Sequence, residues 1–380
     1  MEDRIPVFKP YLGADTSKAA LDALDLGWLG MGSYVRDFEE RLAGVLECTD
    51  RRVIAVNTGT SALHLAMLVA GVGPGDEVVT PSFNNIGDFQ AILAVGARPV
   101  FCDIEEGSLG IDVEKAERLV SPRTKAVIGM DYAGVPCALE ALEAMGRRHG
   151  LTVIHDAAHS LGSRLNGRGM ADFGDITVFS FDPVKIVTCI DGGALVVRSA
   201  DHVEALHRYR LLGMDQSATR MYTNNRAWTY DVAVQGYRYH LANLHASIGL
   251  SQLDRLQEFI DTRRDACRAY AELLRGVDGL TVPDTDFTDV APFIYYVRVA
   301  GGRRDALIAA MRERGVDTGI HWIPGHYFSL LKGARHGDLS VTERVGSEIL
   351  TLPLHSFMSL ATVSRVAALL KDALFERKAA

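Results

Sequence analysis

Lys185 lies in a stretch that could carry out covalent chemistry. Residues 178–181 are mostly apolar, Pro183 ends the strand they predict, and a second apolar run, residues 194–197, follows two glycines. A lysine held between two apolar strands would lose hydration, which lowers the pKa of its amine and favours nucleophilic attack on an aldehyde. Buried lysines are rare, so a loop lysine that points outward is an equal alternative for this stretch alone.

A carboxylate with little water around it is the second candidate. Asp156 follows a strand predicted over residues 151–154 and is flanked by His155 and two alanines. Such a carboxylate needs a cationic or protonated partner. One interpretation is an aspartate that caps the next segment, and the other is an aspartate that pairs with the protonated ring nitrogen of a cofactor.

A glycine turn is the third candidate. Residues 57–61 (Asn-Thr-Gly-Thr-Ser) join a strand predicted at 53–56 to a helix predicted from Ala62. A turn between a strand and a helix N-terminus binds phosphate well, because free backbone N–H groups and the helix dipole both favour an anion. Thr60 and Ser61 add hydroxyl donors, although a plain helix cap would use the same residues.

Together the three stretches match the three chemical handles of pyridoxal 5′-phosphate (PLP). The turn at Gly59, Thr60 and Ser61 suits the phosphate, Asp156 suits the ring nitrogen, and Lys185 suits the aldehyde. Each signal is weak alone, so the PLP hypothesis depends on all three meeting in space.

The elements that must position these residues alternate between strands and helices. Further strands are predicted at residues 98–103 and 125–130, and helices at residues 89–95, 112–120 and 139–149. This alternation predicts an α/β fold with a mostly parallel sheet flanked by helices. Ligands of such sheets bind at the carboxyl ends of the strands, where Asp156 is placed.

The chain is long enough for two domains. We predict a large domain over residues 1–245, with an N-terminal arm, and a smaller C-terminal α+β domain over residues 246–380. A single long amphipathic helix is expected from Ala246 to Leu274. The smaller domain also contains a predicted strand at 295–299 and predicted helices at 304–314 and 361–375.

Composition narrows the possible classes of protein. The net charge of −8 argues against a nucleic-acid partner, and no apolar run has the length of a membrane span. The N-terminus lacks the apolar core of a signal peptide. The five cysteines are scattered without a CxxC pair, which is typical of reduced thiols. We therefore expect a cytoplasmic protein without a nucleic-acid, membrane or metal partner.

Four stretches, taken in order, resemble the motifs of one enzyme family. They are Asn-Thr-Gly-Thr-Ser-Ala-Leu at 57–63, Gly-Asp-Glu-Val-Val-Thr-Pro-Ser at 75–82, Asp-Ala-Ala-His at 156–159, and Phe-Ser-Phe at 179–181 with Lys185 and Gly-Gly-Ala at 192–194. The chain resembles the DegT/StrS sugar aminotransferases, which are PLP-dependent enzymes of fold type I. The likeness covers nearly the whole chain.

The resemblance implies roles for individual residues. Lys185 would bond to the aldehyde of PLP and then move protons, and Asp156 would keep the ring nitrogen protonated. His159 would contact the phenolic oxygen of the cofactor. The phosphate would be bound by Ser180 together with the backbone amides of Thr60 and Ser61.

The resemblance also implies a homodimer with shared active sites. Arg238 and His240 lie in a loop that would reach the cofactor phosphate of the other subunit. His326 occupies a place that the family uses for the sugar substrate, and Trp322 is a candidate for the border of the substrate cleft.

Some positions depart from the family pattern. Asn85 stands where an aromatic residue is expected to stack on the PLP ring, and Phe83 is a candidate to replace that ring. The other departures are His155 for a common Glu, Asp131 for a common His, Ile186 for a common Asn and Arg238 for a frequent Asn. A cation at position 238 would still suit a phosphate.

The resemblance implies transfer of an amino group from an amino acid, with L-glutamate as the expected donor, to a keto-deoxy sugar on a nucleotide diphosphate. A keto-cyclitol is an alternative acceptor that the motifs do not separate. Sugar dehydration is a second alternative, ranked lower because the dehydrating relatives carry His in place of Lys185. A PLP-binding regulator or scaffold is the alternative without catalysis.

Overall fold

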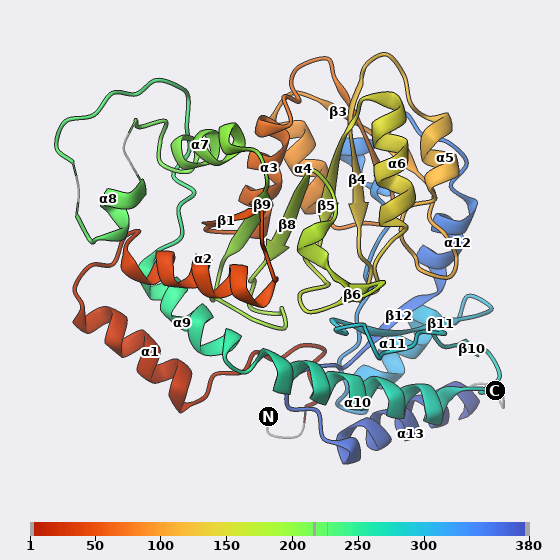
Figure 1. The fold of residues 1–380 in the computed structure, drawn as a ribbon. Coiled ribbons are helices and arrows are strands. Elements are labelled where there is room, and N and C mark those ends of the chain that lie inside the picture. The colour runs from red at the N-terminus through yellow and green to blue at the C-terminus, as the bar shows by residue number, and fades with distance from the viewer. Residues whose placement is uncertain (1–3, 216–217, 226, 377–380) are drawn as a thin grey trace.

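The computed structural model describes residues 4–215, 218–225 and 227–376. A seven-stranded sheet runs through the larger part of the molecule, in the order β1-β9-β8-β5-β4-β2-β3 (Figure 1). All its neighbouring strands pair in parallel except β9, which is antiparallel to both β1 and β8. The bounds are β1 (Arg52–Val56), β2 (Glu77–Pro81), β3 (Arg98–Cys102), β4 (Thr124–Met130), β5 (Thr152–Asp156), β8 (Ile176–Ser180) and β9 (Gly193–Val197). The predicted mostly parallel sheet is confirmed.

Helices cover both faces of the sheet because successive strand residues point to opposite sides. Val78 and Ile154 pack with helices α3, α4 and α7. Their neighbours Val79 and Val153 pack with α5 and α6 on the other face, where α2 and α9 also cover part of the sheet. These helices are α2 (Ser33–Val45), α3 (Gly59–Val69), α4 (Ile86–Ala94), α5 (Val113–Arg118), α6 (Leu139–His149), α7 (Ala200–Tyr209) and α9 (Asn243–Leu253).

The C-terminal part has a sheet of its own. Its three strands pair antiparallel in the order β10-β11-β12 and pack with long helices (Figure 1). The bounds are α10 (Leu256–Leu274), β10 (Leu280–Thr281), β11 (Tyr295–Val299), α11 (Arg304–Glu313), α12 (Ser340–Glu348), β12 (Ile349–Leu352) and α13 (Leu360–Glu376). The predicted strand at 295–299 and the two predicted helices are confirmed.

The single helix predicted from Ala246 to Leu274 is wrong. The chain forms α9 and α10, with a break at Asp254 and Arg255. The two helices serve different neighbours, since α9 packs on α2 and on α1 (Ala14–Asp25), whereas α10 packs on α13. The apolar spacing stays in register across the break, so the pattern does not reveal it. The domain boundary near residue 245 falls inside α9 and stays a prediction.

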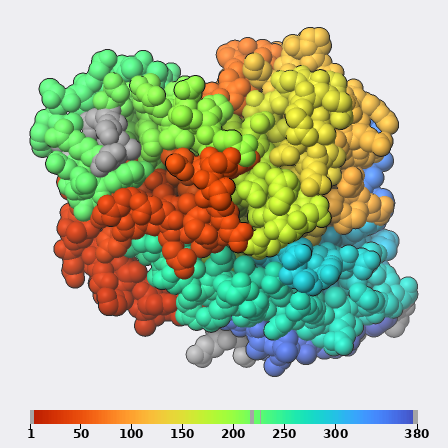
Figure 2. Space-filling view, in the orientation of Figure 1, coloured from red at the N-terminus to blue at the C-terminus, as the bar shows by residue number. Residues whose placement is uncertain are grey.

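The N-terminal segment packs on the C-terminal part before it leads into α1 and α2. Ile5 forms a bridge with Val316, and the ring of Phe8 stacks on Phe293 with centroids 5.4 Å apart. Helices α1 and α2 lie against α9, and α2 also contacts α8 (Ala218–Tyr222). In the space-filling view of Figure 2, the red N-terminal segment lies between the green and the teal segments of the chain. A short hairpin, β6 (Arg164–Leu165) and β7 (Arg168–Gly169), follows β5. Within the described ranges, no helix combines the length and apolar character of a membrane span.

Candidate active site

The three predicted handles line one cavity of about 420 Å³. Asp156 is the last residue of β5, Ser180 is the last residue of β8, and Gly59 begins the helix that follows β1. Lys185 comes from the turn between β8 and β9. The cavity therefore lies at the carboxyl ends of three strands, which is where ligands of parallel sheets bind.

Lys185 is held in a turn with its amine over an aromatic ring. Its backbone N–H donates to the carbonyl of Asp182 at 3.0 Å, and the N–H of Val184 donates to the Asp182 carboxylate at 3.0 Å. The amine lies 4.3 Å from the centroid of Phe293. Loss of hydration lowers the pKa of Lys185 to about 8, against the opposing attraction of Asp156 and Asp182. Part of the residue remains accessible through the cavity, and the outward-pointing alternative is wrong.

Asp156 is 4% exposed and lines the same cavity. One of its oxygens accepts the backbone N–H of Ala158 at 2.9 Å. Burial raises the pKa of this carboxyl, whereas the Ala158 N–H, the Lys185 amine and His155 lower it. The capping and the cofactor-pairing interpretations are compatible, because one carboxylate oxygen accepts the N–H of the next turn while the residue still lines the cavity.

The glycine turn both caps helix α3 and lines the cavity. Thr58 caps α3 by accepting the N–H of Ser61 at 2.9 Å, and the Ser61 hydroxyl accepts the N–H of Thr58 at 3.1 Å. Helix α3 therefore begins at Gly59, earlier than predicted. Ser61 uses both its amide and its hydroxyl in the cap and does not line the cavity, unlike Thr60. The predicted contribution of Ser61 to anion binding has no support in this geometry.

Gly59 approaches Ser180 too closely for any side chain. A Cβ added at Gly59 would lie 2.8 Å from the Cβ of Ser180 and 2.9 Å from its hydroxyl oxygen. The first-turn N–H groups of Gly59 and Thr60 have no partner inside the helix, as at every helix start. These groups and the Ser180 hydroxyl form a small cup that fits a phosphate.

Two buried nitrogens at the cavity lack partners among the described residues. They are Nδ1 of His159 and Nε1 of Trp322, whose rings stack with centroids 5.9 Å apart. Burial, helped by the nearby Lys185, lowers the pKa of His159 well below its usual value, so this ring is neutral. Unpartnered buried polar atoms are uncommon in native proteins. Here they fit a site built to receive a polar ligand such as PLP.

Asn85 lines the cavity but does not replace an aromatic ring. Its side chain accepts the N–H of Gly87 at 2.8 Å and caps α4, which therefore begins at Ile86 and not near residue 89. The suggestion that Phe83 supplies the ring is wrong, because Phe83 is fully buried against Tyr132 outside the cavity.

The aromatic residues that do line the cavity are Phe8, Phe293 and Trp322, together with the imidazole of His321. Of these, only Trp322 was singled out from the sequence. No local sequence pattern marks Phe8 or Phe293 as a site residue, because the two rings come together only in the folded chain. An alignment of aromatic positions across relatives is the signal that could have found them.

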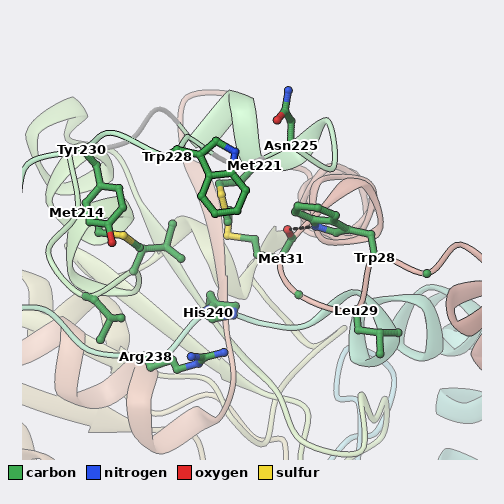
Figure 3. A pocket seen from close by; sticks show the side chains of 14 residues that line it. Trp28, Leu29, Met31, Met214, Met221, Asn225, Trp228, Tyr230, Arg238 and His240 are labelled. Atoms are coloured by element: carbon green, nitrogen blue, oxygen red, sulfur yellow. Dashed lines mark hydrogen bonds between the residues drawn. The ribbon is translucent and has the colours of Figure 1, made fainter.

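Arg238 and His240 do not line the cavity that contains Lys185. They line a second cavity of about 560 Å³ with Trp28, Met31 and Trp228, among others (Figure 3). His240 pairs with Val56 at the end of β1, so this loop runs beside the sheet. A role of the two residues toward another subunit stays a prediction.

His326 also lies outside the cavity that contains Lys185. Its Nδ1 is 2.8 Å from the Ser82 hydroxyl, and its Nε2 is 3.3 Å from a carboxylate oxygen of Glu343. The first contact places the His326 ring beside Ser82, the residue that follows β2. Its substrate role stays a prediction, and Trp322 is the better-placed of the two substrate candidates.

Two departures from the family pattern form one buried pair. His155 Nε2 lies 2.8 Å from Asp131 Oδ2, and the Ser160 hydroxyl donates to the same oxygen at 2.6 Å. The other Asp131 oxygen accepts the N–H of Cys137 at 2.9 Å. The two departures noted in the sequence therefore contact each other in the core of this chain.

The fold and this site define a class of protein, and a family comparison agrees. The model of the DegT/DnrJ/EryC1/StrS aminotransferase family matches residues 10–371. The chain belongs to this family and is an enzyme, which confirms the resemblance noted in the sequence.

Known proteins are similar over the full length. The spore coat polysaccharide biosynthesis protein SpsC of Bacillus subtilis (strain 168) is 33% identical over 377 residues, which are 97% of this chain and 96% of that protein. The crystal structure of the aminotransferase TlmJ from Streptoalloteichus hindustanus is 35% identical, with a TM-score of 0.91 over 98% of this chain and 100% of that one. DesI, crystallised in the presence of its TDP-sugar product, is 29% identical, with a TM-score of 0.88 over 100% of this chain and 95% of that one. These structures confirm the α/β fold.

Proposed function

We propose that this enzyme uses PLP to transfer an amino group from L-glutamate to the keto group of a sugar carried on a nucleoside diphosphate. The observation that carries the proposal is the meeting of Lys185, Asp156 and the Gly59 turn in one cavity. The relatives support the acceptor class, since one is named for polysaccharide biosynthesis and another was crystallised with a TDP-sugar product.

Residues of this chain would hold the cofactor at three points. The Ser180 hydroxyl and the N–H groups of Gly59 and Thr60 would bind the phosphate. Asp156 would bind the ring nitrogen, and Lys185 would bond to the aldehyde carbon. Bound in this way, PLP supplies a carbon that accepts amino groups and a ring that withdraws electrons from it.

Lys185 is suited to move protons near neutral pH. A pKa of about 8 keeps both its neutral and its protonated form populated near neutral pH, which favours general acid–base catalysis. Asp156 would hold the proton on the ring nitrogen, and neutral His159 would contact the phenolic oxygen with its unpartnered Nδ1. Phe293 and Trp322 would exclude water around the reacting atoms.

The active unit in this proposal is a homodimer. Arg238 and His240 of one subunit would reach the cofactor phosphate of the other, since they do not line the Lys185 cavity of their own chain. The N-terminal loop with Trp28 lines the same cavity as Arg238 and would lie at that interface.

The test is an assay with PLP, L-glutamate and a panel of acceptors that includes nucleotide-linked keto sugars and keto-cyclitols. We expect 2-oxoglutarate with the nucleotide-linked sugars, and Lys185→Ala should lower the rate by about 10²–10⁴-fold and remove the visible absorption of bound PLP. Lys332→Ala, a change at an exposed lysine, is the control.

Several outcomes would contradict the proposal. Formation of 2-oxoglutarate with keto-cyclitols alone would favour the cyclitol alternative, and loss of water from the sugar without 2-oxoglutarate would favour dehydration. A complete lack of turnover across the panel would favour a regulator or scaffold. Full activity of Lys185→Ala would exclude the proposed role of that lysine.

A further inference from the structure

A second carboxyl group lies directly beside Asp156, and no step of the proposed reaction uses it. Asp88 is in the first turn of α4 and is fully buried. Its side chain is in hydrogen-bond contact with the Asp156 carboxyl group. Asp88 itself does not line the cavity, so it can act on a bound ligand only through Asp156.

The contacts of Asp88 indicate which of its oxygens carries a proton. The Asn84 side-chain amide donates to Oδ2 of Asp88 at 2.5 Å, so this oxygen acts as an acceptor. No donor in the described parts of the chain faces Oδ1, which is buried. A buried carboxylate oxygen without a donor is costly, whereas a protonated Oδ1 can donate to Asp156. Burial and the charge of Asp156 accordingly raise the pKa of Asp88 well above its usual value.

The contacts of Asp156 indicate the opposite state. Burial raises the pKa of Asp156 as well, but its Oδ1 already accepts the Ala158 N–H, and both the Lys185 amine and His155 favour its negative charge. Two carboxyl groups in contact in a buried site cannot both be ionised, so they share one proton. The surroundings therefore assign the proton to Asp88 and the charge to Asp156.

We propose that Asp88 is a positioning residue, a neutral acid that donates a hydrogen bond from Oδ1 to Asp156 and keeps Asp156 ionised toward the ring nitrogen of the cofactor. The inference rests on the proposed PLP site. No bond forms or breaks in this arrangement. The donated hydrogen bond stabilises the carboxylate form of Asp156, so the proton between Asp156 and the ring stays on the ring nitrogen.

Two matched variants separate this role from a structural one. In Asp88→Asn the amide oxygen can still accept from Asn84 and the amide N–H can still donate to Asp156, which mimics the neutral acid. Asp88→Leu has a similar volume and no donor. If the leucine variant does not fold, Asp88→Ala serves as the variant without a donor.

The first measurement needs no cofactor. Infrared spectra of the cofactor-free wild-type protein at neutral pH should contain the carbonyl stretch of a neutral carboxylic acid, and Asp88→Asn should lose this band. Persistence of the full band in Asp88→Asn, or its absence from the wild type, would overturn the shared proton. This result stands whether or not PLP binds.

The second measurement uses PLP labelled with ¹⁵N in the ring. The nitrogen resonance should report a protonated ring in the wild type and in Asp88→Asn, and should move toward the unprotonated position in Asp88→Leu. The rate with L-glutamate should fall about tenfold in Asp88→Leu at unchanged KM, the effect of one hydrogen bond to a charged group, and Asp88→Asn should restore most of it.

A protonated ring in Asp88→Leu, or an equal displacement in both variants, would overturn the inference. A wild type that fails to bind PLP would instead refute the proposed function, while the infrared band would still decide whether Asp88 is the neutral acid. The two failures are therefore distinguishable.

Discussion

Burial decides the chemical character of the individual side chains at this site. The same loss of hydration lowers the pKa of Lys185, raises that of Asp156 and keeps His159 neutral. An amine that loses its proton easily and a carboxyl group that depends on neighbouring donors are what proton transfer at neutral pH requires. The buried Asp131 carboxylate is likewise matched by polar neighbours, with His155 Nε2 at 2.8 Å and the Ser160 hydroxyl at 2.6 Å.

The state of the Lys185 amine gives a prediction that needs no substrate. In the cofactor-free protein, acylation of Lys185 should increase with pH through a midpoint of about 8, because only the neutral amine reacts. Lys18 is the control, since its exposed ion pair with Asp22 raises the pKa above the usual value. Peptide mass spectrometry after brief labelling would measure both lysines in one sample. Identical pH profiles would contradict the prediction.

At the scale of elements, helix starts and one buried ion pair hold the strand ends in place. Thr58 and Asn85 cap α3 and α4, which fixes the turns that line the cavity. Glu39 of α2 accepts the N–H of Ala55 in β1 at 2.7 Å and contacts Arg210, just after α7, at 2.6 Å. Arg210 also donates to the carbonyl of Ala55 at 2.7 Å. One pair of side chains thus joins two helices to the edge strand of the sheet.

Removing one member of this buried pair should be strongly destabilising. Glu39→Ala leaves the Arg210 guanidinium buried without its carboxylate, and we expect a loss of about 3–5 kcal/mol in the free energy of unfolding. Asp22→Ala, which breaks the exposed pair with Lys18, should cost less than about 1 kcal/mol. Urea denaturation at a fixed protein concentration measures both. Similar losses of unfolding free energy in the two variants would contradict a stabilising role of the buried Glu39–Arg210 pair.

At the scale of the whole molecule, the site draws on segments from both ends of the chain. Phe8 of the N-terminal segment and Phe293 and Trp322 near the smaller sheet close the cavity over the strand ends of the larger one. The second cavity gathers residues from the loop before α2 and from the segment around Arg238 (Figure 3). In the proposed homodimer, this second cavity would lie at the contact between the two copies.

Mixed dimers test whether the active site is shared. Lys185→Ala and Arg238→Ala should each be poorly active, but a dimer with one copy of each keeps one site with both groups. Coexpression should therefore restore about a quarter of the wild-type activity, because about half of the dimers are mixed and each has one intact site. Lys185→Ala with Asp156→Asn is the control, since every site then has a lesion. Failure of the first pair to recover would contradict a shared site.

Local patterns in the sequence predicted much of this protein. The strand, turn and helix around Gly59, the strand that leads to Asp156 and the strand before Lys185 all depend on neighbouring residues, and each was found. The alternation of strands and helices predicted a mostly parallel sheet, whose strand ends collect ligands. The family motifs indicated an aminotransferase, and the family match confirmed it.

Only the tertiary structure decided which distant residues meet. The fold places Asp88 beside Asp156 and Phe8 against Phe293, and the cap at Thr58 uses both the amide and the hydroxyl of Ser61, which does not line the cavity. The break between α9 and α10 depends on which helices each of them packs against. Such contacts join residues far apart in the chain, and a periodic pattern specifies which face of an element is buried without specifying its neighbour.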